Sequence, residues 1–347
     1  MAATLKCDTI QNASSSTANI TLDTAGNATV GNTLAMGSSF LRNRIINGDF
    51  KVAQRGTSFS GNDIYTLDRW NLVSSGAATL AQSTDTPNSS YAASATVTGT
   101  GGSVYAQVRQ RIESVNCVGL SGNAATLSFW VKNVSGSNDL FYTVYYANAA
   151  DNFSAVTDIV PVTTVTSSLS SSWTRYTFTI SSMPSGSANG VGVAIGSTTA
   201  NASFRITGVQ LEVGSVATPF ERRQYGQELA LCQRYLPAFS YASGANPYIA
   251  AGMVTSLSSS TTAWFTVALP VTTRVPPTGV TVSAASHFAA FLPSTATTNA
   301  TGFTFGGATT TSANFNISGL SGTTAGYSTL LFMNTSSAYM YFTGCEL

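Results

Sequence analysis

Along most of the 347 residues, short stretches alternate between apolar and polar residues, with glycine, serine and asparagine between them. In "ATLSFWVK", for example, Leu127, Phe129 and Val131 lie on one side of an extended chain and their neighbours on the other. This period of two predicts antiparallel strands with one buried face and one exposed face. About eight such stretches between residues 44 and 218 predict an all-β fold, a jelly-roll β-sandwich.

Charge is scarce in this chain. Charged residues make up 8% of the sequence and the formal net charge is +1, whereas ordinary soluble domains contain about 25% charged residues. We therefore expect no electrostatic recruitment of nucleic acid or of a membrane surface. No apolar run reaches the roughly 18 residues of a membrane span, so no membrane insertion is predicted. Aromatic residues at 10% argue against a disordered chain.

Residues 1–42 are predicted to form an N-terminal β-hairpin segment. In "ITLDTAGNATVGNTL", Ile20 and Leu22 precede a turn, and Val30 and Leu34 follow it. A two-stranded hairpin is only marginally stable alone. We expect this segment to pack on copies of itself or on a neighbouring protein.

The remaining chain is predicted to contain a jelly roll at 43–218, a linker helix at 219–236 and a second small β-sandwich at 237–347. The helix is indicated by apolar residues at helical spacing, ending before Pro237, namely Tyr225, Leu229, Cys232 and Leu236. After Arg234 the sequence contains only two formal charges, Arg274 and Glu346. A domain so poor in charge is expected to pack against copies of itself or against another protein.

The amino-terminal stretch "MAATLKCDTIQNASSS" lacks the apolar core of a signal peptide, which predicts synthesis in a cytoplasm without secretion. The cysteines are far apart and form no metal-binding motif, so free thiols are expected at Cys7, Cys117, Cys232 and Cys345.

Catalysis is not indicated. Asp63 and Asp68 are close in sequence and could in principle form a carboxylate pair, but such residues more often cap a turn and pair with a cation such as Arg69. The single histidine, His287, has no carboxylate nearby in sequence, and no phosphate-binding loop is present. We expect no enzymatic activity and no cofactor.

Sugar binding fits the composition better. Sandwich proteins can stack exposed aromatic rings on sugars, with polar side chains nearby for the hydroxyl groups. The candidates are Trp130, Trp173, Tyr142, Tyr146 and Arg109, with Gln107 and Arg111 on the same stretch as Arg109. The competing interpretation is that these aromatic residues fill the core of the sandwich.

Six separated motifs in the chain resemble those of bacteriophage tail-fibre and related virion proteins that carry a carbohydrate-binding-module-like jelly roll. They are "NRIINGDFKVAQRGTS", "YTLDRW", "QRIE", "LSFWVK", "SSWTRYTFTI" and "ITGVQLEVGSVATPFERRQYGQELALCQRYL". The resemblance covers about residues 43 to 236. The earlier stretch "ITLDTAGNATVGNTL" also resembles phage fibre segments that form the virion-proximal end, which implies that residues 1–42 serve virion attachment or trimerisation. The later stretch "TTRVPPT" departs from the "MRAAP"-like segment that is common in the family.

The resemblance implies that "INGDF" begins the first strand and that "VQLEVGS" returns beside it. Asp49 and Glu212 would then be neighbours in a structural clasp, satisfied by Arg44, Arg55 or Arg222. It also implies a candidate Ca²⁺ site at Asp49 and Glu212, because oxygen ligands suit this ion.

Two functions follow from the resemblance. The first is an adhesin: a homotrimeric tail fibre, exposed on the virion, that binds glycans of the host surface. The second is a structural virion component, such as a capsid decoration or tail-assembly protein, that uses the same β modules for packing.

Overall fold

The computed structural model describes residues 9–10, 20–22, 24, 28–30, 41–241, 248–255, 261–292, 295–321 and 325–347. The chain divides into two compact units, residues 1–42 and 43–347. In the first unit, β1 (Thr9–Ile10), β2 (Ile20–Leu22) and β3 (Ala28–Val30) form a three-stranded antiparallel sheet. The predicted hairpin is confirmed, since Ile20 pairs with Val30, and β1 adds a strand that was not predicted. Leu34 lies outside the described residues.

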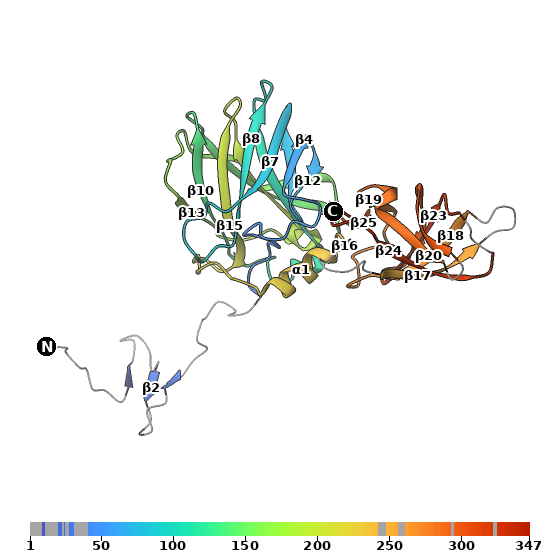
Figure 1. Ribbon diagram of the computed structural model, residues 1–347. Coiled ribbons are helices and arrows are strands. Elements are labelled where there is room, and N and C mark those ends of the chain that lie inside the picture. Colours follow the sequence, from blue (N-terminus) through green and yellow to red (C-terminus); the bar gives the residue numbers. More distant parts are fainter. Residues whose placement is uncertain are drawn as a thin grey trace. The chain divides into compact units, whose positions relative to one another are not determined.

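Two six-stranded antiparallel sheets form the sandwich of the second unit (Figure 1). The first sheet has the order β13-β10-β15-β8-β7-β4 and comprises β4 (Ser58–Gly61), β7 (Ala77–Ser83), β8 (Ser94–Thr100), β10 (Ala125–Ser135), β13 (Thr174–Ile180) and β15 (Ser203–Val213). The second has the order β12-β11-β14-β9-β6-β5 and comprises β5 (Ile64–Tyr65), β6 (Asn71–Ser74), β9 (Ala106–Ile112), β11 (Leu140–Ala149), β12 (Asn152–Thr166) and β14 (Val191–Ser197). The short 3-10 helices η1 (Ser114–Asn116) and η2 (Ser185–Asn189) lie in connecting loops.

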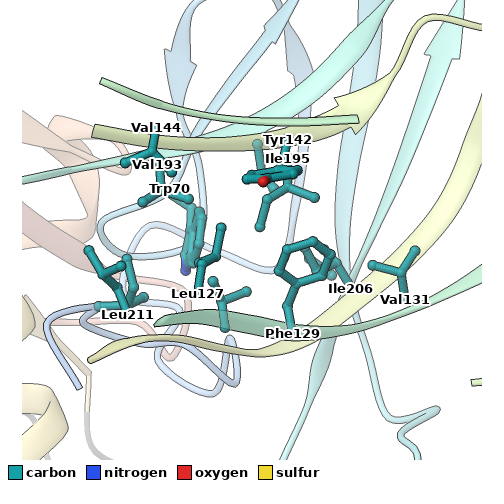
Figure 2. Packing of buried hydrophobic residues seen from close by; sticks show 14 of the residues in the cluster. Trp70, Leu127, Phe129, Val131, Tyr142, Val144, Val193, Ile195, Ile206 and Leu211 are labelled. Carbon is teal, nitrogen blue, oxygen red and sulfur yellow. The ribbon is translucent and has the colours of Figure 1, made fainter. Parts of the chain in front are cut away.

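Alternating apolar side chains from both sheets meet in the core of the sandwich (Figure 2). Leu127, Phe129 and Val131 of β10 are fully buried there, as their spacing predicts. Trp70 lies in the same core and stacks on Phe50, with ring centroids 4.7 Å apart. The aromatic residues of "INGDF" and "DRW" therefore hold each other in place from two different loops.

The helix α1 (Tyr225–Gln233) leads into the carboxy-terminal β region (Figure 1). One sheet there has the order β16-β25-β19 and comprises β16 (Ala238–Ser240), β19 (Gly279–Val282) and β25 (Tyr339–Thr343). The other has the order β21-β20-β24-β17-β18-β23-β22 and comprises β17 (Tyr248–Thr255), β18 (Thr262–Ala268), β20 (Phe288–Leu292), β21 (Thr295–Asn299), β22 (Gly302–Ala308), β23 (Ser312–Ser318) and β24 (Ser328–Met333). The 3-10 helix η3 (Ala285–His287) precedes β20. The predicted all-β chain with a jelly-roll sandwich and one linking helix is confirmed. The carboxy-terminal region, predicted as a second small β-sandwich, is also all-β and consists of a three-stranded and a seven-stranded sheet.

The helix is shorter than the segment assigned to it, and only part of its predicted apolar stripe is buried. Cys232 and Leu236 are buried and Leu229 is partly buried, but Tyr225 is 56% exposed. The N-terminal end of α1 therefore turns its tyrosine away from the core.

Three of the four cysteines lie among the described residues, and Cys117, Cys232 and Cys345 are buried free thiols. Burial raises the pKa of the Cys117 thiol to about 12, which suppresses its reactivity. Cys7 lies outside the described residues. None of the helices in the described ranges is long and apolar enough to cross a membrane.

Candidate functional site

The stretch "INGDF" folds into a tight turn that directs successive side chains to different places. Asn47 adopts a left-handed backbone conformation (φ 57°), which asparagine tolerates better than most residues. Its side chain accepts a hydrogen bond from the Val52 backbone N–H and donates to the Val52 carbonyl, so it closes the turn. The indole of Trp70 donates to the Asn47 carbonyl at 2.9 Å. Phe50 consequently enters the core of the sandwich, whereas Asp49 is buried at a separate position next to Lys51.

Glycine is required at the centre of this turn because β15 passes directly against it. A Cβ atom at Gly48 would lie 2.2 Å from the Val209 carbonyl oxygen. The Val209 N–H donates to the Gly48 carbonyl, and the Arg44 N–H donates to the Leu211 carbonyl. The predicted return of "VQLEVGS" beside "INGDF" is thus confirmed, and backbone hydrogen bonds make the connection. The prediction that "INGDF" begins the first strand is wrong, because these residues form a turn and the first strand of this unit is β4.

A pocket of about 500 Å³ opens beside this turn. Asp49, Lys51 and Gln82 line it together with two further segments, the loop before β8 and the residues that enter α1. The remaining lining residues are Ser83, Thr84, Ala92, Ala93, Arg222, Arg223, Gln224 and Tyr225.

Asp49 is the most unusual group in the pocket. The residue is only 2% exposed, yet its Oδ1 accepts no hydrogen bond. Its nearest cation is Lys51, whose Nζ lies 3.8 Å from Oδ2. Burial raises the pKa of Asp49 and Glu228 adds to this effect, whereas Lys51 and backbone N–H groups act in the opposite direction. A buried oxygen without a partner is costly, so this carboxyl is suited to receive a hydrogen-bond donor from a ligand.

The other groups around the pocket are donors and an aromatic ring. Lys51 is held in place because its Nζ donates to the Arg223 carbonyl at 2.8 Å. Arg223 in turn pairs with Glu228 of α1 at 3.1 Å, which fixes the segment entering the helix. Tyr225 contributes an exposed ring at the rim. The set comprises a carboxyl acceptor, an ammonium donor and an aromatic face, which together match a hydroxyl-rich ligand.

The two tryptophans predicted to stack on sugars lie on the outer face of the first sheet and support a wall of the pocket. Trp130 donates its indole N–H to the Tyr91 hydroxyl at 2.7 Å. Trp173 donates to Asp85 at 3.1 Å, and Lys132, which lies over the Trp173 ring, also pairs with Asp85. These contacts hold the loop 84–93, which supplies Thr84, Ala92 and Ala93 to the pocket.

The remaining sugar-binding candidates are not brought together with these tryptophans. Tyr142 is buried in the core and stacks on Phe178, so its predicted role as an exposed platform is wrong. Tyr146 is partly buried and its ring lies against Gly186 of η2. Arg109 belongs to β9 of the other sheet and pairs with Asp63 at 2.5 Å. Sequence spacing could not show that β9 and β11 belong to a different sheet from β10.

The predicted clasp of Asp49 and Glu212 with Arg44, Arg55 or Arg222 is also wrong. Glu212 is buried and accepts hydrogen bonds from the Thr218 backbone N–H and hydroxyl at 2.9 and 2.6 Å. Arg44 donates to the Val118 carbonyl. Arg55 pairs with Glu346 near the other end of the chain at 2.9 Å. Arg222 is exposed at the pocket rim.

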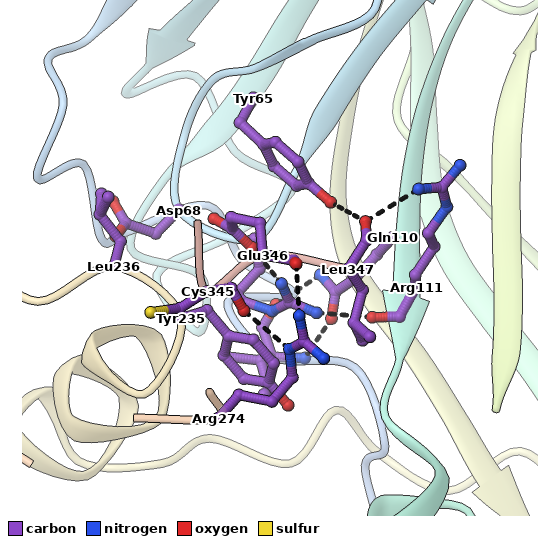
Figure 3. Close-up of polar contacts among 12 residues, drawn as sticks. Tyr65, Asp68, Gln110, Arg111, Tyr235, Leu236, Arg274, Cys345, Glu346 and Leu347 are labelled. Carbon is purple, nitrogen blue, oxygen red and sulfur yellow. Dashed lines mark hydrogen bonds and ion pairs between the residues drawn. The ribbon is translucent and has the colours of Figure 1, made fainter. Parts of the chain in front are cut away.

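Part of the charge in the region from "INGDF" to "DRW" instead contacts residues 345–347, whose polar contacts Figure 3 shows in part. Arg55 and Arg69 both pair with Glu346, and Arg69 also lies over the Tyr235 ring at 3.5 Å. Tyr65 and Arg111 donate to the Leu347 carbonyl. We call this set of contacts to residues 345–347 the carboxy-terminal lock. It connects the sandwich with the second β region through buried ion pairs.

The residues predicted to bind Ca²⁺ do not fit this ion. Asp49 has a cation, Lys51, as its charged neighbour and a raised pKa, and Glu212 is occupied by Thr218. Within the part of the chain that the structure describes, no group of three or more His, Cys, Asp or Glu residues could hold a metal ion.

Asp63 and Asp68 do not form a carboxylate pair. Asp68 is fully buried and accepts hydrogen bonds at 2.6 Å from both the backbone and the side chain of Gln54. Asp63 has an exposed side chain that pairs with Arg109. Asp68 is therefore a structural residue of its turn.

Comparisons with known proteins give distant likenesses only. No family model matches the sequence. No curated protein matches it either. Among solved structures, the chain is similar to the enzymatically active domain of tailspike protein 4 of bacteriophage CBA120, with 16% identity and a TM-score of 0.36 over 50% of this chain and 21% of that one. It is also similar to the CBM22-1 xylan-binding domain of Paenibacillus barcinonensis Xyn10C, with 16% identity and a TM-score of 0.32 over 46% of this chain and 95% of that one.

A third similar structure is TmCBM61 in complex with β-1,4-galactotriose, with 11% identity, a TM-score of 0.31 and coverage of 50% of this chain and 99% of that one. This chain thus spans about a fifth of the tailspike domain and nearly all of the two binding modules. At these TM-scores the likenesses are too distant to place the chain in any of these families.

Of the pocket residues, the sequence analysis offered only Asp49 and Arg222 as site residues, and Tyr225 and Lys51 show why the others escaped it. Tyr225 fits the apolar stripe of a helix, and its sequence spacing gives no sign that it is exposed. Lys51 follows the "INGDF" motif by one residue, and its position beside a buried carboxyl depends on the turn at Asn47.

Proposed function

We propose that this chain is a glycan-binding protein of the phage virion, a tail-fibre-type adhesin without enzymatic activity. The observation that carries the proposal is the buried Asp49 oxygen that has no partner and lies in a pocket with Lys51 and the exposed Tyr225 ring. Sugar hydroxyls can donate to Asp49 and accept from Lys51, while the ring can pack against the apolar face of a sugar. The six sequence motifs that resemble virion proteins supply the biological setting.

As further parts of this proposal, the adhesin is a homotrimer and is made in the host cytoplasm. Residues 1–42 attach it to other virion proteins. The pocket and the sandwich would then be exposed on the particle.

The test is binding of the purified chain to a glycan array and to host envelope, with Asp49→Asn and Tyr225→Ala as variants. Loss of a hydrogen bond to a charged group corresponds to about 1.5 to 3 kcal/mol, so Asp49→Asn should weaken binding by roughly tenfold or more. Asp63→Asn is the matched control, because Asp63 is an exposed carboxylate outside the pocket. Absence of glycan and envelope binding by the wild-type chain would overturn the proposal.

One observation favours a structural virion component as the second candidate. The large sheet of the carboxy-terminal region has no charged residue and carries exposed apolar side chains, which suits packing inside an assembly. Electron microscopy of the particle distinguishes the two, since an adhesin must expose the pocket and a packing protein would bury it.

A further inference from the structure

The outer face of the seven-stranded sheet carries a continuous row of large apolar side chains. Phe291 of β20, Leu330 of β24, Met253 of β17 and Trp264 of β18 lie on four successive strands. Phe291 pairs with Leu330 and Met253 pairs with Trp264, while Leu330 pairs with Ala251, two residues before Met253. Directly paired residues and residues two apart share one face of a sheet, so these four form a single row, which we call the apolar row.

The apolar row is exposed although the opposite face of the same strands is buried. Its four members are between 38% and 53% exposed, whereas the adjacent residues Phe265 and Leu331 are almost completely buried in the core. Four large apolar side chains side by side in water are unusual for a chain that works alone.

Trp264 extends the row onto the neighbouring strands. A Cβ atom at Gly306 of β22 would lie 2.5 Å from Cζ3 of the Trp264 ring. The indole therefore reaches across β23 and lies over a position where only hydrogen fits beneath it. The Trp264 ring can therefore lie flat on the outer face of the sheet.

Charge does not protect this face. The seven strands contain no Asp, Glu, Lys or Arg. The two formal charges of the region after Arg234 take part in the carboxy-terminal lock, since Arg274 donates to the carbonyls of Cys345 and Glu346, and the Glu346 side chain pairs with Arg55 and Arg69.

We infer that the apolar row is the surface through which copies of this chain associate. Because the face is neutral, copies of it can gather around a shared three-fold axis without the like-charge repulsion that opposes most self-association. Seven strands spaced about 4.8 Å apart, each about 20 Å long, present a plane of roughly 600 Å². This is within the range of roughly 600 to 1,000 Å² per partner that a specific interface buries.

The occupant of the face is a second copy of the chain. This inference assigns a surface to the self-association in the proposed function and does not depend on glycan binding.

The experiment measures the mass of the full chain by analytical ultracentrifugation at micromolar concentration, for the wild type, Met253→Glu and Trp264→Glu. A glutamate at either position would bury an unpaired charge in the interface, so both variants should shift the chain to the monomer. Val162→Glu is the matched control, because Val162 of β12 is 62% exposed on the sandwich and should leave the mass unchanged. Circular dichroism establishes that each variant is folded.

A monomeric wild-type chain overturns the inference, as does an oligomer whose mass both variants leave unchanged. Glycan binding is measured on the same samples. If Trp264→Glu abolishes glycan binding without changing the mass, the row is a sugar-binding surface and self-association through it is rejected. If the variants become monomers that still bind glycan with the same affinity per site, the surface and the pocket are separate, as we infer.

Discussion

At the scale of single residues, Asp49 shows how a carboxyl that we propose to bind a ligand can oppose stability. Its carboxyl is buried and one oxygen accepts no hydrogen bond, and burial raises its pKa. A folded-state pKa above the unfolded value of about 3.9 means that the protonated form is favoured in the fold. The stability that comes from this protonated carboxyl is fully present below the unfolded pKa, and it is lost as pH rises through the folded pKa. At neutral pH the ionised carboxyl therefore costs stability.

Asp49→Asn should consequently raise the melting temperature at pH 7 while weakening glycan binding. The stability difference should shrink as pH falls towards the unfolded pKa, because the wild-type carboxyl then becomes neutral as well. Thermal melts across this pH range provide the measurement. A variant that is less stable than the wild type at pH 7 would show that Asp49 is a structural residue.

Asp139 is a control for Asp49, because its pKa is shifted in the opposite direction. Burial acts to raise its pKa, but hydrogen bonds from Ser197, Thr198 and Thr199 outweigh burial and lower it. A lowered pKa contributes stability above the unfolded value, and this is lost as pH falls through the folded pKa. Asp139→Asn should therefore destabilise the chain at pH 7, with a smaller loss in acid.

At the scale of elements, the "INGDF" turn requires its glycine and the start of α1 does not. Gly48 is pressed against β15, where a Cβ atom would meet a backbone oxygen at 2.2 Å. Gly226 lies in the first turn of α1 and has no atom within 4 Å of an added Cβ. The same substitution should thus have opposite effects at the two positions.

Gly48→Ala should destabilise the sandwich by about 1 to 3 kcal/mol, because the strand must move to accept the methyl group. Gly226→Ala should stabilise the chain by up to about 1 kcal/mol, since alanine favours the helix and restricts the unfolded chain. Urea denaturation of both variants provides the comparison. Equal effects would mean that Gly48 does not determine the position of β15.

At the scale of the whole molecule, the carboxy-terminal lock joins the two β regions of residues 43–347. Glu346 accepts from Arg55 and Arg69, and the Arg69 side chain is almost fully buried. Removing one member of a buried ion pair leaves an uncompensated charge, which costs about 3 to 5 kcal/mol.

Glu346→Gln should therefore lower stability by about 3 kcal/mol and separate the melting of the carboxy-terminal region from that of the sandwich. Differential scanning calorimetry should show the single transition of the wild type resolving into two. Asp63→Asn removes an exposed ion pair with Arg109 and should cost less than about 1 kcal/mol. A single, unshifted transition in Glu346→Gln would exclude the lock as a stabilising connection.

Assembly should determine how strongly the molecule holds a surface. A single weak sugar site has a dissociation constant of about 1 mM, or −4.1 kcal/mol. Several linked sites raise the effective concentration for each other. We expect the isolated oligomer to bind glycan weakly. A particle that displays many oligomers should bind host cells tightly. Binding of both forms to the same cells can be compared by sedimentation, and equal affinity would exclude avidity.

The sequence by itself determined the strands, the class of fold and the linking helix. Alternation at Leu127, Phe129 and Val131 is a local property, and burial of one face follows from it wherever the strand is placed. The scarcity of charge after Arg234 likewise predicted a region with an unprotected face. These conclusions need no knowledge of which strands are neighbours.

Only the tertiary structure decided which side chains meet. Arg55 binds Glu346 across 291 residues of sequence, where Asp49 or Glu212 was expected as its partner. Tyr142 entered the core, and Arg109 and Trp130 separated onto different sheets, because strand order is set by packing between distant segments. Asp49 became a pocket residue because the Asn47 turn sends Phe50 inward and leaves the carboxyl beside Lys51. Ion pairs and side-chain packing depend on distances in space, and the alternation of apolar and polar residues along the chain does not determine the distances between separate segments.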